Sequence, residues 1–260
     1  ADFVLVGDQA KIAALAAKMG GSLADLEIVH EPDDRQAARR AVAMVSTSRA
    51  DMLMKGLIGT ADFLRAVLDK EVGLRTGKLL SHVFVVEAPG YDRLLFVTDP
   101  AMNVSPTLAE KAVIIENAVK LVRALGVDPP KVAVLAAVEV VNADMPATVE
   151  AAALAKMADR GQIRNAVVDG PLALDNAVSL EAAKHKGIVS PVAGMADILL
   201  TPDIEAGNML GKALVYFGGV RIAGLVMGAA KPVVATSRAD SAESKVFSVA
   251  LGAYMAAAKN

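Results

Sequence analysis

The sequence predicts an α/β protein built on a mostly parallel sheet. Short β-branched runs alternate with longer segments in which apolar residues recur every three or four positions, the pattern of strands alternating with amphipathic helices. A parallel sheet of this kind is covered by helices on both faces. The composition agrees, because 54% of the residues are hydrophobic but only 3% are aromatic, and small side chains favour closely packed helices.

Length, charge and cysteine usage exclude several classes of function. The 260 residues suffice for one large or two medium domains. A formal net charge of -2 gives no basic field for a nucleic-acid backbone, and no apolar run reaches the about 20 residues of a membrane-spanning helix. We therefore expect neither a nucleic-acid nor a membrane partner. The absence of cysteine excludes disulfides and a cysteine nucleophile and is compatible with the cytoplasm, where we expect the protein.

The N-terminal part alternates strands with helices. The predicted strands are 3–6, 27–29 and 51–54, and the predicted helices are 9–18, 34–46 and a segment around 63–68. Because the chain opens directly on a strand without an initiating methionine, we expect sequence upstream of Ala1.

An antiparallel ribbon is predicted next, from the apolar runs 81–86 and 94–98 on either side of a Pro-Gly turn. Residues 99–106 then break regular structure, and we place the crossing into a second domain there. Domain I is thus predicted to comprise 1–102 plus 235–260, with its N-terminal strand missing, and domain II to comprise 103–234.

The second part continues the alternation. The predicted helices are 107–125, 147–159 and a segment around 210–217, and the predicted strands are 131–137, 163–168, 196–201 and 222–227. Residues 169–175 are predicted as a loop, whose Asp169 and Asp175 lack companions to complete a metal-ligand set. His30, His82 and His185 have no metal-ligand spacing, so each is predicted to be structural or exposed, and no metal site is expected.

The stretch 228–245 is the leading candidate for a site. A short strand at Val233 and Val234 leads into a polar turn and then a helix. A helix N-terminus presents free N–H groups to an anion, the Arg238 guanidinium can form a fork of hydrogen bonds with phosphate, and Ser237 adds a hydroxyl. An ordinary helix cap, with Asp240 as N-cap and Glu243 three residues on, fits the same residues. Both readings can hold for one helix.

Two further segments are candidates for the walls of a site. Lys55 follows the third predicted strand, and ligands of open α/β sheets collect beyond the carboxyl ends of strands. Its side chain is either a phosphate or carbonyl contact or a solvated loop lysine. Asn208 and Lys212 lie four residues apart and share one helix face, which either lines a cleft or faces solvent.

Four strings in the sequence resemble the phosphate acetyl/butyryltransferases, the phosphotransacylases. They are DGPLALDNAVS from Asp169, SPVAG from Ser190, ADILLTPDIEAGNMLGK from Ala196 and TSRADS from Thr236. They occur in family order across nearly the whole chain. The likeness is greatest to the butyryltransferase branch and to the phosphotransacylase half of bifunctional enoyl-CoA hydratase/phosphate acetyltransferases.

The resemblance implies a fold and a reaction. The fold would consist of two three-layer α/β domains with an inter-domain cleft, like isocitrate and isopropylmalate dehydrogenases, usually in a homodimer. The reaction would transfer a short acyl group, acetyl or butyryl, reversibly between coenzyme A and inorganic phosphate. Coenzyme A and acyl-CoA would be substrates, with no tightly bound cofactor and no metal. Relatives carry about one further β-α unit before the string that resembles Asp2 to Asp8.

The resemblance also implies roles for particular residues. Ser237 would hydrogen-bond the CoA sulfur, and Arg238 would hold the phosphate of acyl phosphate. Relatives place a carboxylate base seven residues after the serine, where this chain has Ser244, so Glu243 or Asp240 would have to substitute. Substrate contacts would come from Lys55, Gly56, Thr60, Ser105, Asp203, Asn208, Lys212 and Thr236.

Alternatives to this reading keep the fold and change the function. With no cysteine and no histidine near Ser237 in the sequence, we expect a ternary complex rather than an acyl-enzyme. A metal-dependent decarboxylating dehydrogenase would need an aspartate cluster and a nicotinamide site, and neither is evident. A non-catalytic CoA-binding or scaffolding module is the alternative from a different class.

Overall fold

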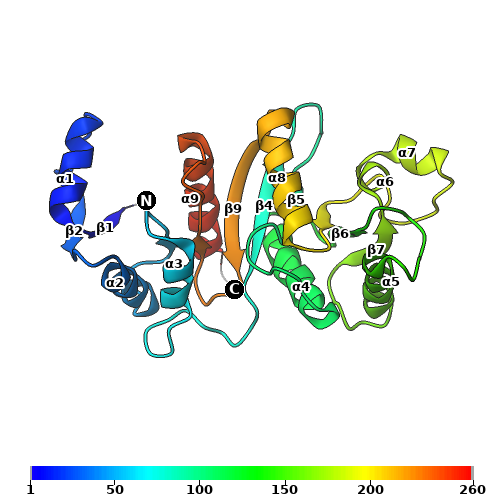
Figure 1. Ribbon diagram of the computed structural model, residues 1–260, viewed down its shortest axis with the longest axis horizontal. Coiled ribbons are helices and arrows are strands. Elements are labelled where there is room, and N and C mark those ends of the chain that lie inside the picture. Colours follow the sequence, from blue (N-terminus) through cyan, green and yellow to red (C-terminus); the bar gives the residue numbers. More distant parts are fainter. Residues whose placement is uncertain (1, 259–260) are drawn as a thin grey trace. The chain divides into compact units, whose positions relative to one another are not determined.

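The computed structural model describes residues 2–258 and divides into two compact units, each of α/β construction as predicted (Figure 1). Unit 1 comprises the N-terminal stretch through Gly77, Ala229–Asp240 and the chain from Gly252 onward. Unit 2 comprises Lys78–Gly228 and Ser241–Leu251. The predicted domain borders, at 102/103 and 234/235, differ from the borders of these two units. They stay a prediction.

Unit 1 contains two pairs of short parallel strands and the helices that follow them. In chain order its elements are β1 (Val4–Gly7), α1 (Gln9–Lys18), β2 (Glu27–His30), α2 (Asp34–Ser46), β3 (Leu53–Met54), α3 (Thr60–Val67) and β10 (Val233–Val234). Strand β1 pairs with β2, and β3 pairs with β10. The three strands and two helices predicted before residue 55 are all present at nearly the predicted positions.

Helix α2 shows why the local pattern was readable. Asp33 caps it, accepting from the Gln36 backbone N–H at 2.8 Å, and its apolar side chains recur at helical spacing. Val42 and Val45 are buried on this stripe, and Phe63 and Val67 are buried on α3, which packs against α2. The sequence predicted a helix over 34–46, and the structure confirms it with these limits.

Unit 2 is organised around a mixed sheet with strand order β9-β4-β5-β8-β6-β7. The antiparallel ribbon is confirmed, because β4 pairs with β5 from Val83 opposite Thr98 to Val86 opposite Leu95. Strand β4 is also antiparallel to β9, whereas β5, β8, β6 and β7 run parallel to one another. The carboxyl ends of these four strands therefore lie along one edge of the sheet.

The elements of unit 2 alternate as predicted, with two additional short helices. They are β4 (Ser81–Glu87), β5 (Leu95–Thr98), α4 (Leu108–Ala124), β6 (Lys131–Leu135), α5 (Pro146–Asp159), β7 (Val167–Leu172), α6 (Leu174–Val178), α7 (Leu180–His185), β8 (Ile198–Leu200), α8 (Ile204–Gly218) and β9 (Arg221–Met227). Helix α9 (Ala242–Ala257) begins in unit 2 and ends in unit 1.

The predicted strand 163–168 and the loop after it were wrong. The strand is β7, which extends through Gly170 and Pro171 to Leu172. Among the described strands β7 pairs with β6 and lies at the edge of the sheet. Proline has no N–H to donate, and an edge strand tolerates this because one of its sides has no neighbouring strand. The sequence suggested a turn because Gly-Pro is usually one, and the edge position was not visible locally.

Two glycines bring α8 into close contact with the sheet. A Cβ added at Gly211 would lie 2.7 Å from Cε2 of Phe84 on β4, and one added at Gly207 would lie 2.7 Å from Oγ1 of Thr201. Both distances are shorter than van der Waals contact, so only glycine allows this approach. The first turns of α8 are thereby held against the carboxyl ends of β5 and β8.

His82 on β4 is buried, which excludes the exposed alternative of the two predicted for it. Its ring makes an edge-to-face contact with Phe84 at a centroid distance of 4.9 Å, and Nδ1 has no hydrogen-bond partner. Burial lowers the pKa of His82 from 6.5 to about 4, because the imidazolium would lose its hydration without gaining an acceptor.

This burial predicts a loss of stability in acid. Between pH 6.5 and pH 4 the unfolded chain binds a proton on His82 and the folded chain does not, so the free energy of unfolding falls as the pH falls. The loss from this group should be about 3 kcal/mol by pH 4. Urea unfolding at several pH values measures it, and in His82→Gln this component should be absent. Equal pH slopes for the two proteins would contradict the assignment.

Candidate functional site

The first group of predicted site residues lies beyond the carboxyl ends of β3 and β10 in unit 1. The two strands are parallel, with Leu53 opposite Val233 and Met54 opposite Val234. The ladder continues one residue further, where the Lys55 N–H donates to the Val234 carbonyl at 2.8 Å. Two segments far apart in the sequence thus leave the same edge side by side, one at Lys55 and the other at Ala235.

Lys55 and Arg238 bind three consecutive backbone carbonyls of the segment between β3 and α3, which we call the carbonyl loop (Gly56–Ile58). Lys55 Nζ donates to the carbonyl oxygens of Gly56 at 3.2 Å and Ile58 at 3.3 Å. Arg238 Nη2 donates to the carbonyl oxygen of Leu57, between them, at 2.9 Å. Lys55 is only 6% exposed, so the reading of a solvated loop lysine was wrong.

Ser237 and Asp240 close a tight turn at the other side of this group. Asp240 Oδ2 accepts from the Ser237 backbone N–H at 2.7 Å, and the Ser237 hydroxyl oxygen accepts from the Ala239 N–H at 3.3 Å. Thr236 is buried beneath the turn, whereas Ser237 and Arg238 are exposed. The Asp240 carboxylate therefore fixes the backbone from which both candidate catalytic side chains project.

The predicted capping box at Asp240 and Glu243 was wrong. Helix α9 begins at Ala242, and the cap is Ser241, whose Oγ accepts from the Ser244 N–H at 3.0 Å. Ser241 Oγ also donates to Ser244 Oγ at 3.0 Å. Asp240 lies one residue too early to cap, because its carboxylate is committed to the turn before the helix. Glu243 is exposed in the first turn of α9 and belongs to unit 2.

Helix α3 presents its N-terminus to the end of the carbonyl loop. Its N-cap is Gly59, which makes no side-chain hydrogen bond, and its first residue is the exposed Thr60. The first N–H groups of such a helix lack intrahelical acceptors and carry the positive end of the helix dipole. Gly56 and Thr60 thus lie in the same loop-and-helix segment as Lys55.

The second group of predicted residues lies in unit 2, beyond the ends of β5 and β8, where Asp99 organises the chain. This carboxylate is 3% exposed. Its Oδ1 accepts from the N–H groups of His82 at 3.2 Å and of Ala101 and Met102 at 3.1 Å. Its Oδ2 accepts from the Asn103 backbone N–H at 3.1 Å and from the Asn103 side-chain amide. Burial raises the pKa of Asp99, and these N–H groups oppose the shift.

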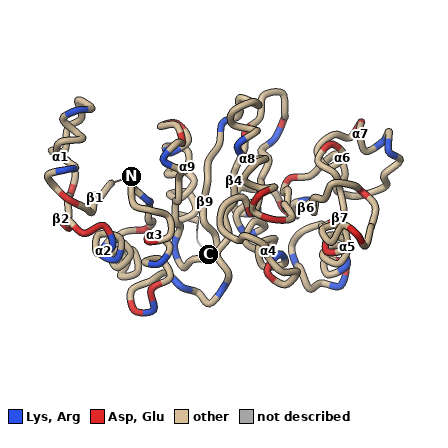
Figure 2. Tube along the Cα trace, viewed as in Figure 1, with Lys and Arg blue, Asp and Glu red and all other residues tan. Residues whose placement is uncertain are grey.

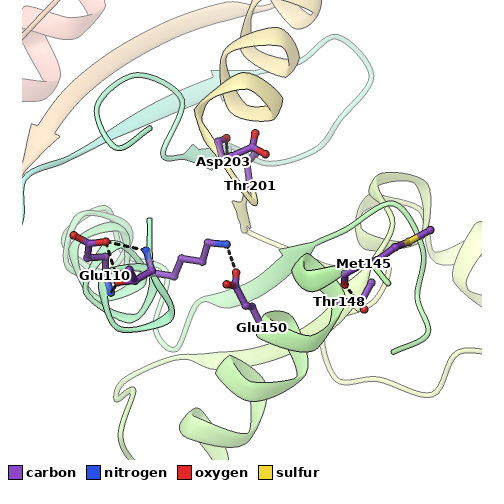
Figure 3. A network of polar contacts seen from close by, with 8 residues as sticks. Glu110, Met145, Thr148, Glu150, Thr201 and Asp203 are labelled. Atoms are coloured by element: carbon purple, nitrogen blue, oxygen red, sulfur yellow. Dashed lines mark hydrogen bonds and ion pairs between the residues drawn. The ribbon is translucent and has the colours of Figure 1, made fainter. Parts of the chain in front are cut away.

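Helix α8 is joined to the loop that Asp99 holds. Asn208 Nδ2 donates to the Pro100 carbonyl at 3.2 Å, and the Ile204 N–H donates to the Val104 carbonyl at 3.1 Å. Asp203 caps the helix, with Oδ1 accepting from the Ala206 N–H at 2.8 Å. Figure 3 shows Asp203 beside Thr201, whose hydroxyl donates to the Asp203 carbonyl at 3.3 Å. Lys212, one turn beyond Asn208, is exposed, as is Ser105.

A separate ion pair joins α4 to α5 in unit 2, and Figure 3 shows its carboxylate partner, Glu150. Lys111 is 5% exposed and pairs with Glu150. Burial makes this pair sensitive to the loss of either partner, because the remaining charge would have no counter-ion. Its contacts join two helices, so we assign it a structural role.

The structure thus gathers the predicted residues into two groups. Unit 1 holds Lys55, Gly56, Thr60, Thr236, Ser237, Arg238 and Asp240, and unit 2 holds Ser105, Asp203, Asn208, Lys212 and Glu243. Sequence reasoning missed Asp99, although the Asp-Pro break after a strand marks its position. It also missed the part that the carbonyls of residues 56–58 play in holding the two cations.

Charges of both signs are interspersed along each unit (Figure 2). Many are paired, as in the ion pairs of Arg39 with Asp69 and of Lys186 with Glu139. Within residues 2–258, no three His, Cys, Asp or Glu side chains come together as a metal site. In that same part of the chain, no helix combines the length and apolar character that crossing a membrane requires.

An α/β sheet with cations, hydroxyls and N–H groups collected beyond its strand ends is typical of an enzyme that acts on a small anionic substrate. Comparison with known protein families identifies the chain more narrowly than this class does. The profile of the family described as "Phosphate acetyl/butaryl transferase" matches residues 4–253. The chain belongs to this family, which confirms the resemblance drawn from the sequence strings.

Individual relatives agree across the whole chain. Phosphate butyryltransferase of Clostridium acetobutylicum is 55% identical over 259 residues, which cover 100% of this chain and 86% of that protein. Phosphate acetyltransferase of Rhizobium meliloti is 49% identical over 254 residues, covering 98% of this chain and 80% of that protein.

Solved structures extend the likeness to three dimensions. The crystal structure of a branched-chain phosphotransacylase from Enterococcus faecalis V583 matches with a TM-score of 0.86 and 34% identity, covering 99% of this chain and 100% of that chain. A 4-hydroxythreonine-4-phosphate dehydrogenase from Klebsiella pneumoniae matches with a TM-score of 0.57 and 15% identity over 97% of this chain and 90% of that chain, a likeness of fold alone.

The cap assignment predicts a pair of stability effects. Ser241→Ala removes the acceptor for the Ser244 N–H and should lower the free energy of unfolding by about 1 kcal/mol. Glu243→Ala, its matched control in the first turn of α9, should change that free energy by less than about 0.5 kcal/mol. Denaturant titration measures both. A larger loss of unfolding free energy in Glu243→Ala than in Ser241→Ala would contradict the assignment and favour Asp240 and Glu243 as the capping pair.

Proposed function

We propose that this chain is a phosphotransacylase that transfers a short acyl group, acetyl or butyryl, between coenzyme A and inorganic phosphate. Acyl-CoA and phosphate give acyl phosphate and CoA, reversibly. Family membership and the names of relatives at 49% and 55% identity support this reaction. The observation that carries the site is the pair Lys55 and Arg238, two cations on one strand edge with the Ser237 hydroxyl beside them.

The chemistry requires two anions to be stabilised in turn. A phosphate oxygen attacks the thioester carbonyl carbon, the carbonyl oxygen gains negative charge, and the C–S bond then breaks to release CoA thiolate. Arg238 has five N–H donors, of which Nη2 contributes one to the carbonyl oxygen of Leu57, so its planar fork can also bind phosphate. The Ser237 hydroxyl can donate a hydrogen bond to the leaving sulfur and keep its proton. Fixed donors of this kind stabilise developing charge without reorganising.

In the reverse direction a base must remove the proton from the CoA thiol, whose free pKa is about 8.5. Ser244 cannot serve as this base because it has no carboxylate. Its backbone N–H donates to Ser241 Oγ. Asp240 accepts the Ser237 N–H and is assigned an orienting role. We therefore assign the base to Glu243, the exposed carboxylate that follows it.

A ternary complex fits these residues better than an acyl-enzyme. The chain has no cysteine, and a serine nucleophile would need an adjacent base. The histidine of unit 1, His30, has another partner, because its Nδ1 accepts a hydrogen bond from the Gln9 N–H at 3.1 Å. We infer direct transfer from CoA to phosphate, with Ser237 as a hydrogen-bond donor to sulfur.

We extend the proposal to architecture and assembly. The chain would form two three-layer α/β domains, 1–102 plus 235–260 and 103–234, around a cleft as in isocitrate and isopropylmalate dehydrogenases. We also propose a homodimer in the cytoplasm with no tightly bound cofactor or metal. The fold likeness to a dehydrogenase supports the architecture, and family membership supports the substrates.

Phosphate-dependent release of CoA from acetyl- and butyryl-CoA tests the function, with thiol detection. Arg238→Ala should lower kcat/KM for phosphate by about 10²- to 10³-fold, the cost of one preorganised donor to a developing anion. Arg238→Lys, the matched control, keeps the charge but loses the fork and should recover part of the loss. When the concentrations of both substrates are varied, double-reciprocal plots of the wild-type rate should give intersecting lines, as a ternary complex requires.

Three outcomes would count against the proposal. No phosphate-dependent CoA release by the wild type would favour the alternative of a non-catalytic CoA-binding or scaffolding module. Unchanged kinetics of Arg238→Ala would remove Arg238 from the site. Parallel lines, with burst release of one equivalent of CoA in the absence of phosphate, would indicate an acyl-enzyme.

A further inference from the structure

The side chain of Leu57 projects from the middle of the carbonyl loop into solvent. Its exposed fraction is 75%, whereas the neighbouring Ile58 is only partly exposed. Gly56 and Gly59 lie on either side, and each has no atom within 4 Å of where a Cβ would stand. Leu57 is therefore the large apolar side chain at the crest of this loop, and it stands in open space.

The backbone of Leu57 is fixed by the same guanidinium that the proposed function assigns to phosphate. Arg238 Nη2 lies 2.9 Å from the Leu57 carbonyl oxygen. On either side, Lys55 Nζ holds the carbonyls of Gly56 and Ile58 at 3.2 and 3.3 Å. Three successive anchored carbonyls leave the residue little freedom to move away. An acyl phosphate held by Arg238 has its acyl carbon one oxygen away from the phosphorus, so its chain must begin next to this loop.

We propose that Leu57 is a specificity-determining residue that packs against the acyl chain of the substrate. This inference rests on the proposed phosphotransacylase function and adds what distinguishes one acyl group from another. Each methylene group beyond acetyl gains apolar contact with the Leu57 side chain and loses contact with water. The charged groups around it interact with the phosphate and thioester, which are the same in every substrate, so they do not sense chain length.

The test compares acyl-chain preference in matched variants. In Leu57→Ala, kcat/KM for butyryl-CoA relative to acetyl-CoA should fall by about tenfold, the discrimination available from one or two methylene contacts. The value for acetyl-CoA should fall less than the value for butyryl-CoA, because acetyl lacks the methylene groups that would contact Leu57 and the anchoring carbonyls are backbone atoms. Leu15→Ala on α1 is the control, since Leu15 is also an exposed leucine of unit 1, at 50%, and should leave the ratio unchanged.

Binding gives a second readout that does not depend on turnover. The Kd ratio of butyryl-CoA to acetyl-CoA should move toward one in Leu57→Ala, and Leu57→Met, which keeps an apolar side chain of similar size, should retain the wild-type ratio. An unchanged or increased preference for butyryl-CoA in an active Leu57→Ala enzyme would overturn the inference. So would an equal loss for both substrates, which would mean that Leu57 only supports the loop. A wild type inactive with every acyl-CoA would instead refute the proposed function.

Discussion

The site in unit 1 depends on the binding of three consecutive carbonyl oxygens by two cations. Lys55 comes from the end of β3 and Arg238 from the turn after β10, segments more than 180 residues apart that the parallel strand pair brings together. Burial of the Lys55 ammonium would be costly without acceptors, and the Gly56 and Ile58 carbonyls supply them. The loop and the two cations thus stabilise each other.

This arrangement has a chemical consequence. Carbonyl oxygens are neutral acceptors, so these three hydrogen bonds orient Lys55 and Arg238 without adding a negative charge beside them. The Asp240 carboxylate is instead turned to the Ser237 N–H and fixes the turn. Two cations thus lie at the strand edge, where a phosphate and a leaving thiolate would both need positive charge. Unit 2 uses the opposite device, in which the Asp99 carboxylate collects N–H groups to shape its loop.

Much of the fold could be predicted because its signals are local. Helix α2 carries its cap and its apolar residues within one short segment, so the sequence predicted a helix there, and the two runs around Pro89-Gly90 predicted the β4–β5 ribbon. The β3–β10 pairing involves two residues on each strand, too short for a periodic pattern. Edge position decides that Pro171 can stay in β7, and one residue of helix register decides that Ser241, not Asp240, is the cap. The sequence indicated Lys55 by its place after a strand and Arg238 by its place in the TSRADS string, but it did not show that both side chains bind the same loop, because that contact depends on the tertiary structure.

The central claim is that Lys55 and Arg238 act as one unit through the carbonyl loop, and a double-mutant cycle tests it most directly. The measurement is kcat/KM for phosphate in wild type, Lys55→Met, Arg238→Met and the double variant. We expect strong non-additivity, with the double variant little worse than the poorer single variant, because losing either cation releases the loop that positions the other. Additive losses, in which the two fold-changes multiply, would contradict the claim.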